Sequence, residues 1–273
     1  MRILKVVGKS FVDFFRDDGL MLAGAMSYFS MMALVPFCLF LITLFGYFLG
    51  HYPEFYNFFL AKLVDFFPDV THDITDEILK LISYKGLGQF SLVLYGLLSY
   101  QVFASLENSL NVIFKIKKKR NFFFSILVSL LVVTLIIALL ITSFAATSII
   151  PLLKTYKAFG ISLKIGKIKE VIIRFVLPFI LVLFTVNMMY MLIPRVRIRF
   201  ANAFKGAFFT TIFLEIAKHV FTWYVGAVAQ FGKIYGPLTA FVVFLLWVFY
   251  SSSIFLIGAE VVRNLGGSKK ALQ

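Results

Sequence analysis

Residues 105–120 read SLENSLNVIFKIKKKR, and this stretch separates two classes of protein. Its first half places Glu107, Asn108 and Asn111 in an otherwise apolar segment, and its second half is strongly basic. Acidic and amide residues followed by a basic run are typical of a nucleic-acid enzyme. They are equally typical of a membrane helix that contains a buried polar group and ends in the cytoplasm. The rest of the chain decides between the two.

The composition of the whole chain favours the membrane protein. Of its 273 residues, 61% are hydrophobic and only 15% are charged, and the mean hydropathy is +0.94. Soluble domains are about half apolar and about a quarter charged. A soluble chain of this length would need far more polar surface to cover one core, so the excess apolar surface must face lipid.

Six apolar segments reach the length of about 20 residues that a helix needs to cross a bilayer. They lie near residues 23–50, 88–114, 121–150, 171–193, 202–228 and 237–262. Their apolar runs are continuous and lack the alternation of a transmembrane barrel, so we expect an all-α, polytopic membrane protein. Because no internal repeat or separate soluble region is visible, we predict one membrane domain over residues 1–273.

Two further segments have helical patterns outside these spans. The N-terminus mixes acids into its first apolar stretch, which argues against a cleavable signal peptide. Its apolar residues recur at helical spacing, at Ile3, Leu4, Val7, Phe11, Phe14 and Phe15. We therefore predict an amphipathic helix that lies on the membrane surface.

The external connection 51–87 is acidic, and its pattern predicts short helices, with Asp73 as the N-cap of one.

The distribution of Lys and Arg predicts that both termini are cytoplasmic, because the cytoplasmic ends of membrane segments carry an excess of these residues. Most of the net charge of +14 lies before residue 17, within 115–120, within 195–205 and after residue 262, although the Lys-rich connection 154–169 falls on the other side. We define a basic rim that would attract anionic lipids. Its members are Lys115, Lys117, Lys118, Lys119, Arg120, Arg195, Arg197 and Arg199.

Polar residues inside the spans are candidates for a functional site, because an ionisable group in a bilayer is costly unless it is paired or hydrated. The candidates are Glu107, Asn108, Asn111, Asn187, Tyr190, Glu215, Lys218, Tyr235 and Glu260. By their distance from the basic helix ends, five of them should lie at similar depth in the cytoplasmic half: Glu107, Asn111, Asn187, Tyr190 and Glu260. This predicts a polar cavity open or gated toward the cytoplasm. Asn108 and Asn111 can equally form hydrogen bonds between helices.

The charged candidates also have structural interpretations. Glu215 with Lys218 and Glu260 with Arg263 have the i, i+3 spacing of local ion pairs that neutralise costly charges. Glu107 is harder to explain in this way, because no cation lies one turn away on its own helix.

The sequence predicts no catalytic residue, metal or cofactor. A single cysteine, Cys38, excludes an intrachain disulfide and a cysteine-based metal site. His72 and Asp76 could bind a metal weakly, but a capped surface helix explains them better. HExxH, GxSxG and phosphate-binding loops are missing. The basic residues form short clusters at segment ends rather than a face with stacking aromatics, so we expect neither nuclease activity nor a nucleic-acid partner.

Four motifs are spread along most of the chain: AGAMSYFSMMALVP at 23–36, FASLENSLNVIF at 103–114, YMLIP at 190–194 and IYGPLTAFVVFLLWVFYSSSIFLIGAE at 234–260. They resemble the YihY/BrkB family of bacterial inner-membrane proteins, once named ribonuclease BN. Pro237 departs from the small hydroxyl residue usual in that family. The resemblance implies an inner-membrane location and about six helices, suggests a role in lipid translocation, and implies no catalytic residue.

We therefore expect a bacterial inner-membrane protein that transports or flips an amphipathic, lipid-linked substrate in envelope biogenesis. Glu107 and Glu260 would be its gating or proton-linked residues. The second interpretation is a protein that does not transport and instead holds an envelope-assembly partner through the acidic 51–87 loop.

Overall fold

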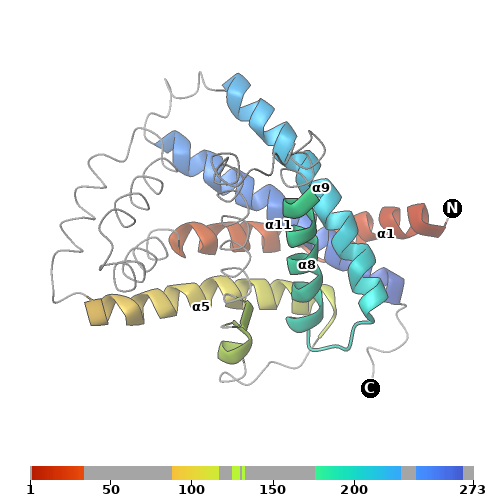
Figure 1. Cartoon of the computed structure of the whole chain (residues 1–273), viewed down its shortest axis with the longest axis horizontal. Coiled ribbons are helices and arrows are strands. Elements are labelled where there is room, and N and C mark those ends of the chain that lie inside the picture. Colours follow the sequence, from red (N-terminus) through yellow and green to blue (C-terminus); the bar gives the residue numbers. More distant parts are fainter. Residues whose placement is uncertain are drawn as a thin grey trace, which may run out of the picture. The chain divides into compact units, whose positions relative to one another are not determined.

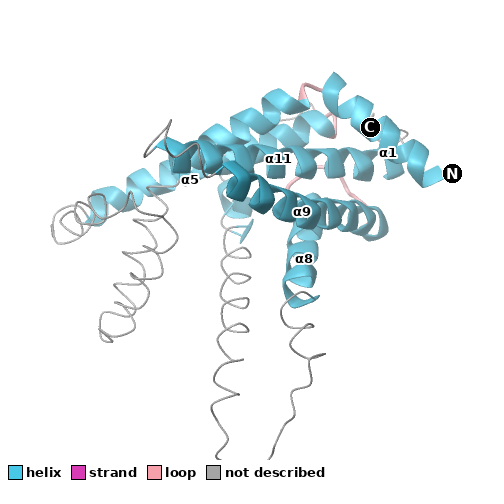
Figure 2. Cartoon of the chain, turned by 90° about the horizontal axis from the view of Figure 1, so that it is seen from above, coloured by secondary structure: helices cyan, strands magenta, loops and turns pink. Residues whose placement is uncertain are grey.

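The computed structural model describes residues 2–33, 88–116, 125–129, 131–132, 176–228 and 238–266 (Figure 1). Every regular element within these ranges is a helix and none is a strand, as Figure 2 shows. The all-α prediction is thereby confirmed. The predicted short helices of the 51–87 connection lie outside the described residues.

The described helices follow the predicted spans. The labelled helices are α1 (Arg2–Arg16), α5 (Gly88–Ile113), α8 (Leu177–Leu192), α9 (Phe200–Val228) and α11 (Leu238–Gly266). An apolar helix over Gly19–Ala33 follows α1, and short helical stretches occupy 125–129 and 131–132. Helix is therefore present in the described part of each of the six predicted spans. The predicted N-terminal helix is also present, as α1.

By length and hydropathy, one helix in the described ranges could cross a membrane: Phe241–Gly266 within α11, with a mean hydropathy of 2.2. The helices Gly19–Ala33 and Pro178–Leu192 are apolar but shorter. α9 has 29 residues, but Glu215 and Lys218 interrupt its apolar sequence. The number of spans thus stays a prediction.

The chain divides into two compact units. The first comprises residues 1–20, 107–219 and 253–273, and the second comprises residues 21–106 and 220–252. In the second unit, the Ser27 hydroxyl donates a hydrogen bond to the carbonyl oxygen of Leu245 at 2.7 Å. The rings of Phe221 and Trp247 pack with centroids 5.0 Å apart. These contacts join the helix at 19–33 and the end of α9 to α11. The candidate residues that the structure describes all lie in the first unit.

Two glycines let α9 and α11 pack closely in the first unit. A Cβ atom on Gly206 would overlap Val262 and lie 3.0 Å from the carbonyl oxygen of Gly258. A Cβ atom on Gly258 would overlap the Thr210 hydroxyl and lie 2.5 Å from the hydroxyl of Tyr190. Small residues at such crossings bring helix backbones together, which is how helices commonly associate in lipid.

Tyr190 on α8 fills the space beside Gly258 and joins three helices. Its side chain is fully buried, and its ring stacks on that of Phe255 with centroids 4.9 Å apart. Its hydroxyl donates to the carbonyl oxygen of Phe255 at 2.6 Å and lies 2.8 Å from the Thr210 Oγ1 atom. A buried tyrosine needs such partners, because an unpaired hydroxyl in an apolar core is costly. Tyr190 therefore acts as a packing residue of α8, α9 and α11.

Replacing Gly258 by alanine should destabilise the first unit. The new methyl group would collide with Thr210 and Tyr190, and overpacking of this kind costs about 1–3 kcal/mol. The melting temperature of the purified protein in detergent should fall. Gly24→Ala is the matched control, because a Cβ atom there meets nothing within 4 Å. Equal melting temperatures for the two variants would contradict the packing described here.

Candidate functional site

The helix ends that carry basic residues meet at one end of the first unit. Arg263, near the end of α11, donates a hydrogen bond to the carbonyl oxygen of Ile113 at the end of α5, at 2.7 Å. Asn264 on α11 donates to the Ser10 hydroxyl on α1 at 3.0 Å. The start of α9 packs on the same turns of α11 through its first glycine. The N-terminal helix, the end of α5 and the first turns of α9 thus all contact the last turns of α11. The side of the membrane on which they lie stays a prediction.

Arg263 is the centre of an ion-pair network between α1 and α11. Its Nη1 atom lies 2.8 Å from Asp17 Oδ2, and its Nη2 atom lies 2.9 Å from Asp13 Oδ2. Its Nη2 atom also lies 2.7 Å from Glu260 Oε2, so the i, i+3 pair expected from the sequence is present. Lys115 pairs with Asp17 from the end of α5. We call these five residues the Arg263 network.

The end of α5 is shaped to deliver Lys115. Lys115 has a φ of 57°, in the left-handed region, and its N–H bonds to the carbonyl oxygen of Val112 at 3.0 Å. The N–H of Ile116 bonds to the carbonyl oxygen of Asn111 at 2.8 Å. This is the Schellman pattern of helix termination, which glycine normally serves. Since a non-glycine residue there is unfavourable by about 1 kcal/mol, the contact with Asp17 helps to hold it.

Asp17 is ionised within this network. Burial raises the pKa of Asp17, but hydrogen bonds from Lys115 and Arg263 lower it by more. The resulting pKa lies below the ordinary value of 3.8. The carboxyl group of Asp17 is therefore negatively charged at neutral pH, and its ion pairs with Lys115 and Arg263 depend on that charge.

Glu107 has a partner on the next predicted span. Its side chain is 7% exposed, and its Oε2 atom accepts a hydrogen bond of 2.5 Å from the hydroxyl of Ser125, which is itself buried. The sequence-based prediction considered only cations on the helix of Glu107 and therefore did not find this partner. Ser125 lies near the start of the next apolar span, but its pairing with Glu107 is visible only in the three-dimensional packing.

The asparagine candidates have three different environments. Asn187 on α8 is buried, Asn111 is half-buried and Asn108 is exposed. In the described part of the chain, the side-chain oxygens of Asn111 and Asn187 accept no hydrogen bond. A buried oxygen without a donor is unfavourable by about 1–3 kcal/mol. The described residues therefore do not supply the helix-to-helix acceptor bonds proposed for Asn111.

A charged cluster lies midway along α9. Glu215 Oε1 is 2.5 Å from Lys218 Nζ and 3.6 Å from His219 Nε2, so the expected local ion pair is present. The side chains of Glu215, Lys218 and His219 are 38%, 51% and 68% exposed. Glu215 lies about 22 Å along the axis from the start of α9, since each residue rises about 1.5 Å. The sequence identified this pair but not its exposure.

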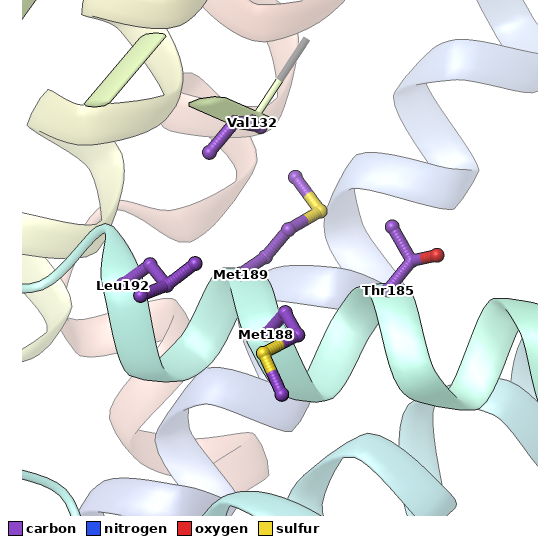
Figure 3. A pocket seen from close by; sticks show the side chains of 5 residues that line it. All are labelled: Val132, Thr185, Met188, Met189 and Leu192. Atoms are coloured by element: carbon purple, nitrogen blue, oxygen red, sulfur yellow. The ribbon is translucent and has the colours of Figure 1, made fainter. Parts of the chain in front are cut away.

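A pocket in the first unit lies beside α8 (Figure 3). It is lined by Val132, Thr185, Met188, Met189 and Leu192. These side chains are almost entirely apolar, and none of them is a predicted site residue.

Five predicted residues lie outside the described part of the chain: Tyr235, Lys117, Lys118, Lys119 and Arg120. Of the remaining rim, Arg195 is half-buried, while Arg197 and Arg199 are exposed. A common polar cavity stays a prediction.

Replacing Arg263 by glutamine should destabilise the end where the helices meet. Asp13, Asp17 and Glu260 would be left close together without their shared cation, and breaking a largely buried ion pair costs about 3 kcal/mol. We expect a lower melting temperature in detergent and faster tryptic cleavage within α1. Arg197→Gln removes the same charge from an exposed position and should change neither. Unchanged stability and protection in Arg263→Gln would contradict this role.

The network should also weaken in acid. The pKa of Asp17 in the folded protein is below the ordinary 3.8, so the ionised form stabilises fully above about pH 5. That contribution is lost as the pH falls through the lowered pKa. The difference in melting temperature between wild type and Asp17→Asn should be large at pH 7 and should shrink below pH 4. A difference that is constant with pH would rule out ionic stabilisation by Asp17.

Comparison with known proteins places the chain among membrane proteins. A UPF0761 membrane protein of Vibrio vulnificus (strain YJ016) is 29% identical over 248 residues, which cover 89% of this chain and 77% of the relative. Another from Chlorobium chlorochromatii (strain CaD3) is 28% identical over 268 residues, covering 94% of this chain and 60% of the relative. A third, from Chromohalobacter salexigens, is 30% identical over 277 residues, covering 98% and 65%.

None of these relatives bears the name of an enzyme. No solved structure matches the chain. The family model described as Virulence factor BrkB matches residues 10–271, nearly the whole sequence. The chain is therefore a membrane protein that belongs to the BrkB family.

Proposed function

We propose that this protein moves an amphipathic, anionic, lipid-linked substrate across the bacterial inner membrane, with both termini in the cytoplasm. The observation that carries the proposal is the exposed charged cluster of Glu215, Lys218 and His219 in the middle of α9. A charged side chain at bilayer depth is tolerated where it meets water, a counter-charge or a polar group, and not where it meets lipid chains.

The surface of α9 matches an amphipathic substrate. Lys218 and His219 could bind an anionic head group. The neighbouring negative charge of Glu215 would weaken this binding enough for the head group to be released. On another face of the same helix, Ile216 and Val220 are 53% and 57% exposed. These apolar side chains could face the acyl chains of the substrate or of the bilayer. Polar and apolar strips on one helix thus offer both kinds of contact that such a substrate needs.

The two carboxylates expected to act in gating are assigned different roles. Glu260 is fully buried and pairs with Arg263, which supports a structural role in holding α1. Glu107 has a hydroxyl partner in Ser125, and a buried carboxylate of this kind is expensive to keep in a membrane protein. We therefore assign gating or proton coupling to Glu107. The basic helix ends at one end of the first unit would concentrate anionic head groups there.

Reconstituted liposomes containing fluorescent phosphatidylglycerol test the proposal by the rate at which the inner-leaflet probe becomes accessible to an external quencher. Wild type should accelerate this exchange over protein-free liposomes. Lys218→Gln should slow it by about tenfold, the effect of losing a contact worth about 1.4 kcal/mol in the transition state. Glu107→Gln should slow it as well.

Lys205→Gln is the matched control, because it removes a positive charge from an exposed position of α9 outside both the cluster and the basic rim. Fluorescent phosphatidylcholine reports on the preference for an anionic head group. Wild type no faster than empty liposomes would exclude translocation of this lipid and favour the envelope-assembly interpretation. Wild-type rates in both Lys218→Gln and Glu107→Gln would exclude the proposed residues.

A further inference from the structure

The surface of α1 that points away from the protein is apolar along one strip. Leu4, Phe11 and Phe15 recur at helical spacing and are 78%, 45% and 55% exposed, and the neighbouring Val12 is 67% exposed. Helical residues separated by seven and eleven positions lie on one face. By contrast, Phe14 is 2% exposed and packs against Gly19. We call the four exposed residues the apolar strip of α1.

A basic strip runs beside the apolar strip. Lys5, Lys9 and Arg16 are all exposed, and their spacing of four and seven residues places them on one side of the helix. Two of the three acids at this end have the opposite placement, and the third, Asp18 in the turn after α1, is exposed. Asp13 lies within α1 and Asp17 directly after it, and their side chains are only 15% and 9% exposed. Both are held inward by the Arg263 network, so α1 presents apolar and positively charged groups outward.

We infer that α1 is a membrane-surface helix selective for anionic phospholipids, and that Arg263 sets this selectivity by withdrawing Asp13 and Asp17 from the surface. An apolar strip beside a basic strip fits the boundary between acyl chains and phosphate head groups. Positive charge close to an anionic leaflet adds attraction that a neutral leaflet lacks.

The connection of α1 to the next helix favours a bilayer over a soluble protein as its partner. Only the two residues of the turn at 17 and 18 separate α1 from the apolar helix Gly19–Ala33. Because the chain is a membrane protein, this short turn keeps α1 at the level where an apolar helix begins. The inference does not depend on the proposed transport activity.

Spin labels on the full chain in nanodiscs test the inference. In a Cys38→Ser background, single cysteines replace Leu4 or Phe15, and collisions with oxygen are compared with collisions with a water-soluble nickel chelate. Oxygen should dominate at both positions when the disc contains phosphatidylglycerol, and the preference should fall in discs of phosphatidylcholine alone. A label that either reagent reaches poorly would show that α1 docks on protein, and a water-exposed label would also overturn the inference.

Charge variants test the selectivity. Lys5→Gln with Lys9→Gln should remove the difference between the two kinds of disc, whereas Lys205→Gln, at an exposed position of α9, should keep it. Arg263→Gln should reduce the difference, because two acids return to the surface of α1. Adding Asp13→Asn and Asp17→Asn to Arg263→Gln should restore it even though the ion pairs are still missing. Failure of this restoration would show that Arg263 acts through folding alone and would overturn its assigned role.

Discussion

The first unit depends on the fork of one guanidinium group. Arg263 reaches two aspartates from α1, a glutamate one turn before it and a backbone carbonyl at the end of α5. A lysine ammonium could not make these contacts together, because it lacks the planar arrangement of donors on two nitrogens. Without Arg263, three acidic side chains would lie close together with no cation beside them. Through these contacts the arginine attaches α1 and the end of α5 to α11.

Close helix packing then determines which polar groups remain outside. Gly206 and Thr210 face α11, where Tyr190 and Gly258 also meet. The rotation of α9 that satisfies this contact leaves Glu215 and Lys218 partly exposed one to two turns later. Packing at one part of the helix and exposure at another thus have a common cause, and the exposed cluster need not result from poor local packing.

The sequence was sufficient for properties that lipid imposes on every helix. Long apolar runs identified the helices, and the spacing of Glu260 and Arg263 identified their pair, because both depend on neighbours along the chain. Contacts that depend on how each helix is rotated could not be predicted: Asp13 and Arg263 are 250 positions apart. Tyr190 was a cavity candidate, yet its hydroxyl is engaged by Thr210 and Phe255. One polar residue in a span can seal a helix contact or line a cavity, and composition does not distinguish them.

Lys115, the residue with left-handed backbone at the end of α5, couples the detachment of α1 to the fraying of α5. The backbone at position 115 would be most relaxed with glycine, whereas the contact with Asp17 requires a long cationic side chain. The ionic contact therefore offsets an unfavourable conformation of the helix end. When Asp17 moves away, the last turn of α5 loses what holds it, so detachment of the N-terminal helix and fraying of α5 are cooperative. A disturbance on the membrane surface would in this way reach the helix that carries Glu107.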